Sequence, residues 1–413
     1  MRNLKDSGVE WLGDIPESWE IVQLGSLFAE HKQKNSGMQS SNLLSLSYGN
    51  IIRKDINTSD GLLPESFEGY NVIKNGDIVL RLTDLQNDHR SLRVGLCYET
   101  GIVTSAYVTL RSRSEFLNSQ YFYYLMHSFD IKKGFYGMGA GVRQGLNYAG
   151  VSKILLAVPS EKEQIEIANF LSAKLESTDS LIKNVNSQIS RLKAYKKSII
   201  FEAITQGLDK NSAMKDSGYA WIGNVAECFQ VMRLKDVAFI LDQFRKPITA
   251  DQRNQDAEVL YDYYGASGAI DKIDGYTIDD HVMLIGEDGA NLRMRNLPLM
   301  YEVNGKAWIN NHAHILKPKN NMLFYYLFYA LEGLDINPYI TGSAQPKLNQ
   351  ENLKIIPIPV PSLETQEKIV EHISYKLKKI DELIALKQAK IDKLQLYRNS
   401  LIYEYVTGKK EVS

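Results

Sequence analysis

The sequence predicts an α+β protein with two similar globular domains and two long helices that pair as an antiparallel coiled coil. Two internal repeats, a heptad pattern in the longer repeat, and strand-like apolar runs elsewhere carry this prediction. Because each half of the chain holds one copy of each repeat, we expect a pseudo-twofold arrangement. The predicted segments are a first globular domain over 1–157, a first long helix over 158–207, a second globular domain over 208–357 and a second long helix over 358–413.

The shorter repeat lies near the start of each half. Residues 5–25 (KDSGVEWLGDIPESWEIVQLG) match residues 215–235 (KDSGYAWIGNVAECFQVMRLK), with Lys, Asp, Ser, Gly, Trp, Gly, Glu and Leu shared. The longer repeat aligns residues 158–205 with residues 360–407 without a gap, and 18 of these 48 positions are identical. The two halves therefore share a frame, whereas the sequence between the repeats has diverged.

Each copy of the longer repeat predicts a helix, near 161–204 and near 364–406. Apolar residues recur in alternating steps of three and four, and this 3.5-residue period is typical of a narrow coiled-coil seam. Both copies start after Pro-Ser, where the Ser can cap free amides. About 40 residues give a rod of roughly 60 Å, which is long enough to act as a spacer. The predicted seam residues are Leu171, Leu175, Ile182, Val185, Ile189, Leu192, Ile199, Ile373, Leu377, Ile380, Ile384, Ile391, Leu394 and Leu401.

Both globular segments alternate apolar runs with turn residues, which predicts mostly antiparallel sheet. Each segment ends in a short aromatic helix around a Phe-Tyr-Tyr-Leu sequence. The predicted strand regions are 43–52, 76–82 and 102–110 in the first half and 258–265, 281–286 and 308–316 in the second.

Polar loops rich in Arg, Asn, Gln, His and Tyr occupy the divergent stretches 83–93, 141–147, 265–268, 287–295 and 343–349. Arg can pair with guanine and Asn or Gln with adenine, while Lys, Ser and backbone amides bind phosphate. One such loop alone is more typical of an ordinary solvated loop, but two matched sets favour a two-part site for a polymer. The predicted DNA-binding residues are Gln86, Asn87, His89, Arg90, Arg93, Arg143 and Gln144 in the first half, and Tyr264, Ser267, Asn291, Arg293, Arg295, Gln345 and Lys347 in the second.

Composition excludes several classes of protein. With 48 Lys and Arg, 49 Asp and Glu and 44% hydrophobic residues, the chain is not disordered, collagenous or uniformly basic. Cys97 and Cys228 are far apart, which excludes a disulfide scaffold and fits a reducing cytoplasm. The polar N-terminus does not resemble a signal peptide, and no apolar run is long enough to span a membrane, so we expect a cytoplasmic protein.

No catalytic motif occurs in the sequence. It contains no phosphate-binding GxxxxGK[ST] loop, no FxGxG with [DN]PP[YF] of adenine methyltransferases, no CxxC pair and no HExxH. Alternate residues of a strand point to opposite faces, so His312 and His314 do not predict a metal site. Glu287 and Asp288 resemble nuclease carboxylates, but acidic residues before Gly are typical of turns. We predict no catalytic residue and no metal.

These residues resemble the specificity subunits of Type I restriction-modification enzymes. The resemblance rests on KDSGVEWLGDIPESWE, its partial repeat KDSGYAWIG and the twice-repeated VPS-x-x-x-Q at the start of each long helix. The GVRQGLN and SAQPKLN loops and the LIGEDGA and WINNHAHIL runs are similar to target-recognition domains of that family. The resemblance covers nearly the full length.

The resemblance implies a non-catalytic subunit for host defence that binds a bipartite, asymmetric sequence in double-stranded DNA, one domain per half. It also implies two modification subunits that methylate adenine with S-adenosylmethionine, and restriction subunits that cleave DNA with ATP and magnesium. This chain itself would hold no cofactor. The long helices and the KDSG segments would be docking surfaces for the partner subunits.

The near-neutral total charge argues against a DNA-binding protein, but local basic patches suffice where partner subunits supply further phosphate contacts. An alternative is a scaffold or adaptor without DNA that holds peptides or sugars at a fixed spacing. A third class, an autonomous nuclease or methyltransferase, is disfavoured by the missing motifs.

Overall fold

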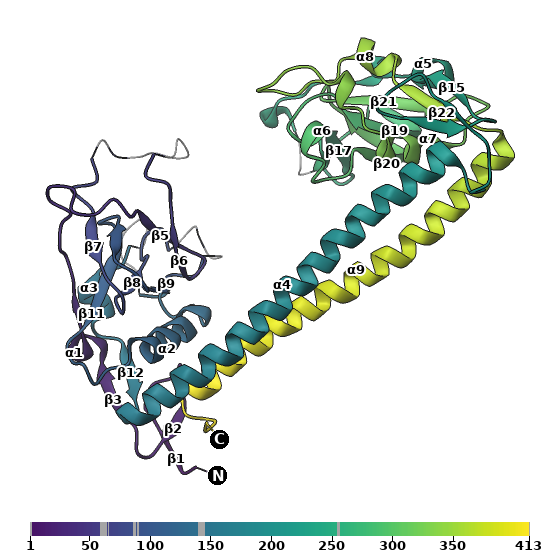
Figure 1. The fold of residues 1–413 in the computed structure, drawn as a ribbon. Coiled ribbons are helices and arrows are strands. Elements are labelled where there is room, and N and C mark those ends of the chain that lie inside the picture. The colour runs from purple at the N-terminus through teal and green to yellow at the C-terminus, as the bar shows by residue number, and fades with distance from the viewer. Residues whose placement is uncertain are drawn as a thin grey trace. The chain divides into compact units, whose positions relative to one another are not determined.

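The computed structural model describes residues 2–57, 64, 66–85, 88, 91–138, 145–253 and 257–412. The chain divides into two compact units (Figure 1): unit 1 is Met1–Val185 with Gln388–Ser413, and unit 2 is Asn186–Lys387. Each long helix contributes one part to each unit. The units thus divide the chain within the long helices, and the domain limits that we drew from the sequence stay a prediction.

Both units begin with the same series of elements. In unit 1 these are β1 (Leu4–Asp6), β2 (Asp14–Pro16), β3 (Glu20–Gln23), α1 (Leu24–Leu27) and β4 (Phe28–Glu30); in unit 2 they are β13 (Met214–Asp216), β14 (Asn224–Ala226), β15 (Gln230–Arg233), α5 (Leu234–Val237) and β16 (Ala238–Ile240). The repeated KDSG sequence makes the same turn twice. The Asp6 carboxylate accepts a hydrogen bond from Gly8 N and the Asp216 carboxylate from Gly218 N, both at 2.9 Å. Both glycines have positive φ, which other residues adopt at a cost.

Antiparallel sheets form the body of each unit, as predicted. In unit 1 the strand order is β4-β11-β8-β9, beside the pairs β7-β10 and β5-β6. In unit 2 it is β16-β21-β19-β20-β17-β18, and β17 runs parallel to β20. The remaining elements of unit 1 are β5 (Leu44–Ser47), β6 (Asn50–Arg53), β7 (Asn71–Ile73), β8 (Ile78–Leu80), β9 (Val94–Leu96), β10 (Gly101–Val103), β11 (Val108–Ser112), α2 (Ser119–Ile131), α3 (Tyr148–Val151) and β12 (Leu155–Val158). Those of unit 2 are η1 (Asp242–Phe244), η2 (Ala250–Gln252), β17 (Tyr261–Gly265), β18 (Gly268–Ile273), β19 (Ile278–Gly286), α6 (Asn291–Met294), β20 (Met300–Ile309), β21 (Ala313–Pro318), α7 (Phe324–Gly333), η3 (Asn337–Tyr339), α8 (Gln350–Lys354) and β22 (Pro357–Val360).

A buried glutamine joins each globular body to its long helix. Gln164 Oε1 accepts from Asn118 N at 2.9 Å, just before aromatic helix α2, and its Nε2 donates to Pro159 O at 3.0 Å. Gln366 accepts from Leu323 N at 2.9 Å, just before α7, and makes the matching bond to the Pro before its own helix. The repeated VPS-x-x-x-Q sequence is therefore a structural joint in both units.

The two long helices, α4 (Glu161–Gln206) and α9 (Leu363–Val406), end within two residues of the predicted limits. In unit 1 the Phe170 ring lies 4.5 Å from the Tyr405 ring, and Asp179 lies 3.3 Å from Arg398. In unit 2, Lys196 Nζ contacts Asp381 at 2.6 Å. Within each unit the helices run antiparallel, as predicted. Every predicted seam residue is buried or partly buried. Nowhere in the described ranges is a helix both long and apolar enough to cross a membrane.

Candidate nucleic-acid interface

The three predicted polar loops of the second half meet at the end of β19 in unit 2. Leu348 N donates to Glu287 O at 2.7 Å, and Gly289 N donates to Pro346 O at 3.0 Å, so the 287–295 and 343–349 loops lie side by side. The 265–268 turn lies against Gly286, because a Cβ added there would be 2.6 Å from the backbone oxygen of that turn. These distant segments therefore form one loop cluster.

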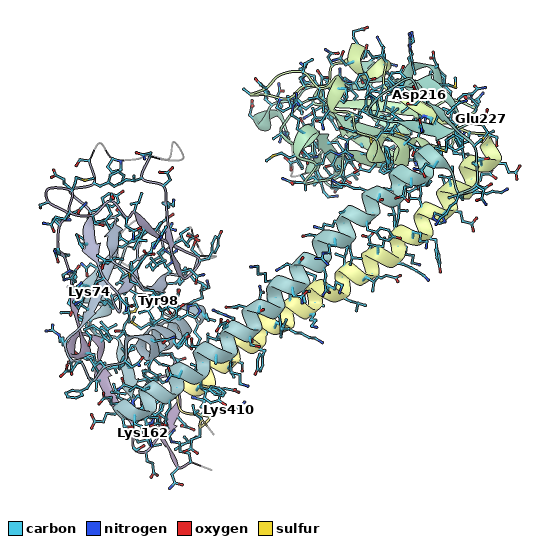
Figure 2. All side chains as sticks on the ribbon, viewed as in Figure 1. Lys74, Tyr98, Lys162, Asp216, Glu227 and Lys410 are labelled. Carbon is cyan, nitrogen blue, oxygen red and sulfur yellow. The ribbon has the colours of Figure 1, made fainter. Side chains whose placement is uncertain are left out.

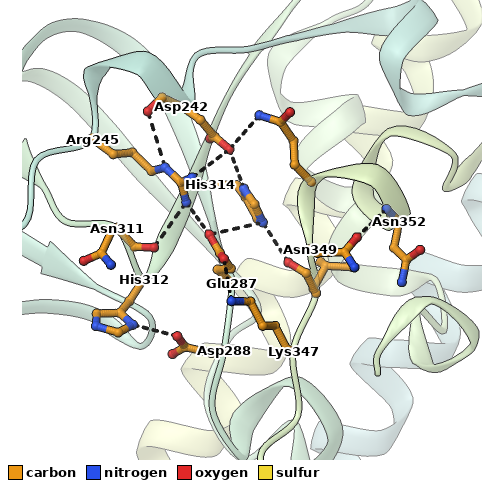
Figure 3. A network of polar contacts seen from close by, with 12 residues as sticks. Asp242, Arg245, Glu287, Asp288, Asn311, His312, His314, Lys347, Asn349 and Asn352 are labelled. Atoms are coloured by element: carbon orange, nitrogen blue, oxygen red, sulfur yellow. Dashed lines mark hydrogen bonds and ion pairs between the residues drawn. The ribbon is translucent and has the colours of Figure 1, made fainter. Parts of the chain in front are cut away.

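Glu287 is the centre of an ion-pair network in this cluster (Figure 3). It pairs with Arg245, its Oε1 lies 3.2 Å from Lys347 Nζ, and His314 Nε2 lies 3.9 Å away. Burial raises the pKa of Glu287, but hydrogen bonds from Arg245 and Lys347 and the charge of His314 together hold it below its usual value. The Lys347 side chain is still 54% exposed, so its charge is available at the surface.

His312 and His314 differ in burial and in their contacts. His314 is fully buried; its Nδ1 lies 2.7 Å from Asp242 Oδ2 and its Nε2 lies 2.8 Å from Leu348 O. Because a carbonyl oxygen only accepts, Nε2 carries a proton, and the ring ties η1 to the 343–349 loop. His312 is half exposed and contacts Asp288 at 2.6 Å. In the part of the chain that the structure describes, no group of three or more His, Cys, Asp or Glu side chains could hold a metal ion.

The three predicted residues around α6 make contacts within the protein. Arg293 is exposed and donates to Ile340 O at 3.0 Å, beside the 343–349 loop. Arg295 has a positive φ and a mostly buried side chain, which donates to Glu332 O. Asn291 accepts from Leu297 N at 2.9 Å and so closes the turn that follows α6. Arg295 and Asn291 thus hold the loop, whereas Arg293 presents charge at the surface.

The structure brings Ser267, Arg293, Gln345 and Lys347 to exposed positions in the loop cluster, while Tyr264 lies partly buried on β17. This arrangement offers two cations, a hydroxyl and an amide at one end of a sheet. Cations suit phosphates, and Arg and Gln can also pair with base edges.

In unit 1, six of the seven predicted residues (Gln86, Asn87, His89, Arg90, Arg143 and Gln144) lie outside the described residues. The seventh, Arg93, is buried and donates to Thr83 O at 2.7 Å and to Arg81 O at 3.3 Å. A side chain without exposed surface cannot reach a base while the loop keeps this conformation. The burial of Arg93 argues against the predicted DNA contact. Its hydrogen bonds instead hold the loop that follows β8.

A Leu-Asn pair anchors the last predicted loop in the same way in both units. Leu146 N donates to Leu82 O at 3.0 Å in unit 1, and Leu348 N makes the matching bond to the end of β19 in unit 2. The next residue caps a short helix: Asn147 accepts from the third residue of α3 at 3.1 Å and Asn349 from the third residue of α8 at 2.8 Å. The common part of GVRQGLN and SAQPKLN is therefore an anchor, and the polar residues before it are free to differ.

Comparison with known proteins agrees with this architecture. A family described as "Type I restriction modification DNA specificity domain" matches residues 227–396. The MjaVIII specificity subunit of Methanocaldococcus jannaschii, a type I restriction enzyme component, is 24% identical over 96% of this chain and 93% of its own length. Residues 227–396 thus match the type I specificity domain, and nearly the whole chain is similar to a type I specificity subunit.

Two further similarities fit this family. A type I specificity subunit described for Haemophilus influenzae is 34% identical over 33% of this chain and 34% of that protein. A solved structure titled "Structural basis underlying complex assembly and conformational transition of the type I R-M system" has a TM-score of 0.68 at 14% identity. It covers 96% of this chain and 99% of the compared chain, which supports the fold.

Sequence reasoning missed two residues of the loop cluster in unit 2. Arg245 follows β16 in the segment QFRKP and pairs with both Glu287 and Asp242. His312 was considered only as a metal ligand, although its half-exposed ring lies in the cluster. Arg245 follows no predicted strand. His312 falls inside the predicted strand region 308–316, which the structure divides into the end of β20, a turn and the start of β21, so the sequence marked neither residue as part of a loop.

Proposed function

We propose that this chain recognises a bipartite, asymmetric DNA sequence for a type I restriction-modification complex, with one unit for each half of the target. The observation that carries the proposal is that two units share one scaffold and anchor their loops alike, yet differ in the polar residues between the anchors. To recognise a split target whose halves differ in sequence, a protein needs two similar scaffolds with different recognition loops. Base contacts specify sequence, and phosphate contacts position the protein.

In unit 2 we assign distinct roles within the loop cluster. Lys347 is a point charge that suits a phosphate, and Ser267 can also bind one. Arg293 can pair with guanine and Gln345 with adenine in the major groove. In unit 1 the predicted contacts stay those of the 83–93 and 141–147 loops, without Arg93.

We propose that the chain supplies recognition and no reacting group. Two modification subunits would bring the S-adenosylmethionine for adenine methylation, and restriction subunits would bring ATP and magnesium for cleavage. The surface of α9 supports docking of such partners, because large apolar side chains outside the seam are exposed: Leu383 47%, Leu386 68%, Leu396 69% and Tyr397 52%. Leu383 and Leu386 belong to unit 2, and Leu396 and Tyr397 belong to unit 1, so each unit offers exposed apolar side chains on its part of α9.

The decisive experiment is to map methylated adenines in DNA from cells that express this chain with its modification subunits. We expect one split motif. Replacing residues 231–357 with the matching segment of another specificity subunit should change one half of the motif and keep the other. Methylation without a split motif, or a change in both halves, would overturn the proposal. A purified complex that binds no duplex in filter binding would favour the scaffold alternative.

A further inference from the structure

The hairpin β5-β6 in unit 1 has an unusual residue at its tip. Ser47 pairs with Asn50, so Tyr48 and Gly49 form a two-residue turn, and their φ values are 45° and 82°. Such a turn needs positive φ at both positions, and its preferred sequence is Asn-Gly. Among the described residues other than Gly with positive φ, Tyr48 is the only aromatic one. A bulky side chain in this conformation is strained.

Packing of the ring does not compensate for this strain, because Tyr48 is 69% exposed. The backbone of the turn, in contrast, is held on two sides. Tyr123 Oη donates to Gly49 O at 3.3 Å, and a Cβ added at Gly49 would lie 3.2 Å from Leu92 Cβ. The hairpin therefore fixes its tip while it leaves the aromatic ring in solvent, and strain at a surface position is a sign of function rather than of stability.

The tip lies beside the predicted recognition loop of unit 1. Leu92, which lies against Gly49, belongs to the 83–93 loop. Arg93 holds that loop through its hydrogen bond to Thr83 O. A cavity of about 650 Å³ adjoins the tip; Tyr48, Lys133 and Arg398 are among the residues that line it. Tyr48 therefore borders the 83–93 loop and a hollow that is lined by Lys133, Arg398 and Asp179, which pairs with Arg398. An exposed ring beside such cations suits a nucleotide, because the ring can contact a thymine methyl group and the cations can bind phosphate.

We infer that Tyr48 is a specificity-determining residue of unit 1 that contacts a base of its half-sequence through the face of the ring. This inference rests on the proposed function of DNA recognition. Neither the 83–93 loop nor the 141–147 loop contains this residue, so the hairpin tip adds a third element to the interface. A contact of this kind stabilises the bound state when the ring face lies against a thymine methyl group in the major groove.

The test uses a substitution whose effects on fold and binding have opposite signs. Tyr48→Asn places the preferred Asn-Gly sequence in the turn, so the melting temperature of the complex with its modification subunits should stay equal or rise by about 2 °C or more. Affinity for a duplex that carries the mapped motif should fall by about 5- to 150-fold, which is the usual loss for one wrong base pair in a specific site. Tyr48→Phe keeps the ring face and should bind within about twofold of wild type.

The matched control is Tyr98→Asn. Tyr98 is 65% exposed in the same unit and lies after β9, at the other end of that strand from the 83–93 loop (Figure 2). We expect no change in its affinity. A second readout does not depend on variant stability: duplexes with 5-iodouracil in place of thymine, in or beside one half-sequence, should photo-crosslink to Tyr48 only in the half assigned to unit 1.

Each outcome decides the inference. Wild-type affinity of Tyr48→Asn, an equal loss in Tyr48→Phe, or no crosslink to Tyr48 would overturn it. If Tyr48→Asn instead fails to assemble with the modification subunits, the ring contacts protein and the inference is wrong. Failure of the proposed function is distinguishable, because the wild-type complex itself would then show no split motif.

Discussion

Ile189 lies in the seam of unit 2, where it is 8% exposed. Replacing it with Asp removes a covered apolar side chain, which contributes about 1.5–3 kcal/mol, and leaves a carboxylate without a partner at a mostly buried position. Together these effects should lower the local free energy of unfolding by about 3–5 kcal/mol. Because α4 in unit 2 is held by α9, the loss should appear in both helices of that unit.

The assay is hydrogen exchange of the backbone amides, measured segment by segment in the variant and in the wild-type protein. Each 1.4 kcal/mol is a factor of ten, so amides of α4 beyond residue 186 should lose roughly two to four orders of magnitude of protection. The matched control is Leu386→Asp on α9 in the same unit, which is 68% exposed and should change stability by less than about 0.5 kcal/mol. Equal protection in Ile189→Asp and wild type would refute the reasoning that this seam holds the two helices together.

Three other predictions address the loops and the joints. Burial raises the pKa of Asp130 to about 6, above its value in the unfolded chain. Protonated Asp130 therefore stabilises unit 1, and this contribution is lost as the pH rises from about 4 to 6. In urea unfolding, Asp130→Asn should remove up to about 3 kcal/mol of this pH dependence, and equal pH profiles of variant and wild type would contradict this. Gln164→Leu should lower hydrogen-exchange protection at the start of α2 by about 2–3 kcal/mol, and Gln366→Leu should do the same at the start of α7, because buried backbone groups lose their hydrogen-bond partner. Lost protection in the unit that does not carry the substitution would argue against separate joints. Lys347→Ala should weaken binding to all duplexes alike and should reduce the slope of log affinity against log salt concentration by about one. A change in the methylated motif would instead show that Lys347 contacts a base.

The long helices were predictable because their signal is local. The 3.5-residue period and the Pro-Ser starts depend only on neighbouring residues, and the observed limits of α4 and α9 differ from the predicted ones by at most two residues. The repeated segments were predictable for a related reason. Two copies of one sequence fold alike, so the KDSG turns and the glutamine joints appear once in each unit.

The candidate site was predictable as loops but not as single residues. The 265–268, 287–295 and 343–349 loops do meet in unit 2, yet Arg295 and Asn291 bond to neighbouring backbone groups. An Arg that holds a loop and an Arg that contacts a base look the same in sequence, because burial is decided by residues far along the chain. Arg93 illustrates this, since its partners follow from how the loop folds back on it. Tyr48 was not predicted because it lies within the predicted strand region 43–52 and in none of the divergent polar loops.

If the proposed function holds, the anchors of the two loops would let one scaffold serve different DNA sequences. The bonds that close the recognition loops start from the main-chain amides of Leu146 and Leu348 and from the caps Asn147 and Asn349, all after the polar stretch. Polar residues before the anchor can therefore change without loss of these bonds. Each unit also has its own glutamine joint, so a substitution in the loops of one unit leaves the joint of the other intact. On the proposed function, recognition could thus diverge between the two halves of the chain while the frame that supports it stays the same.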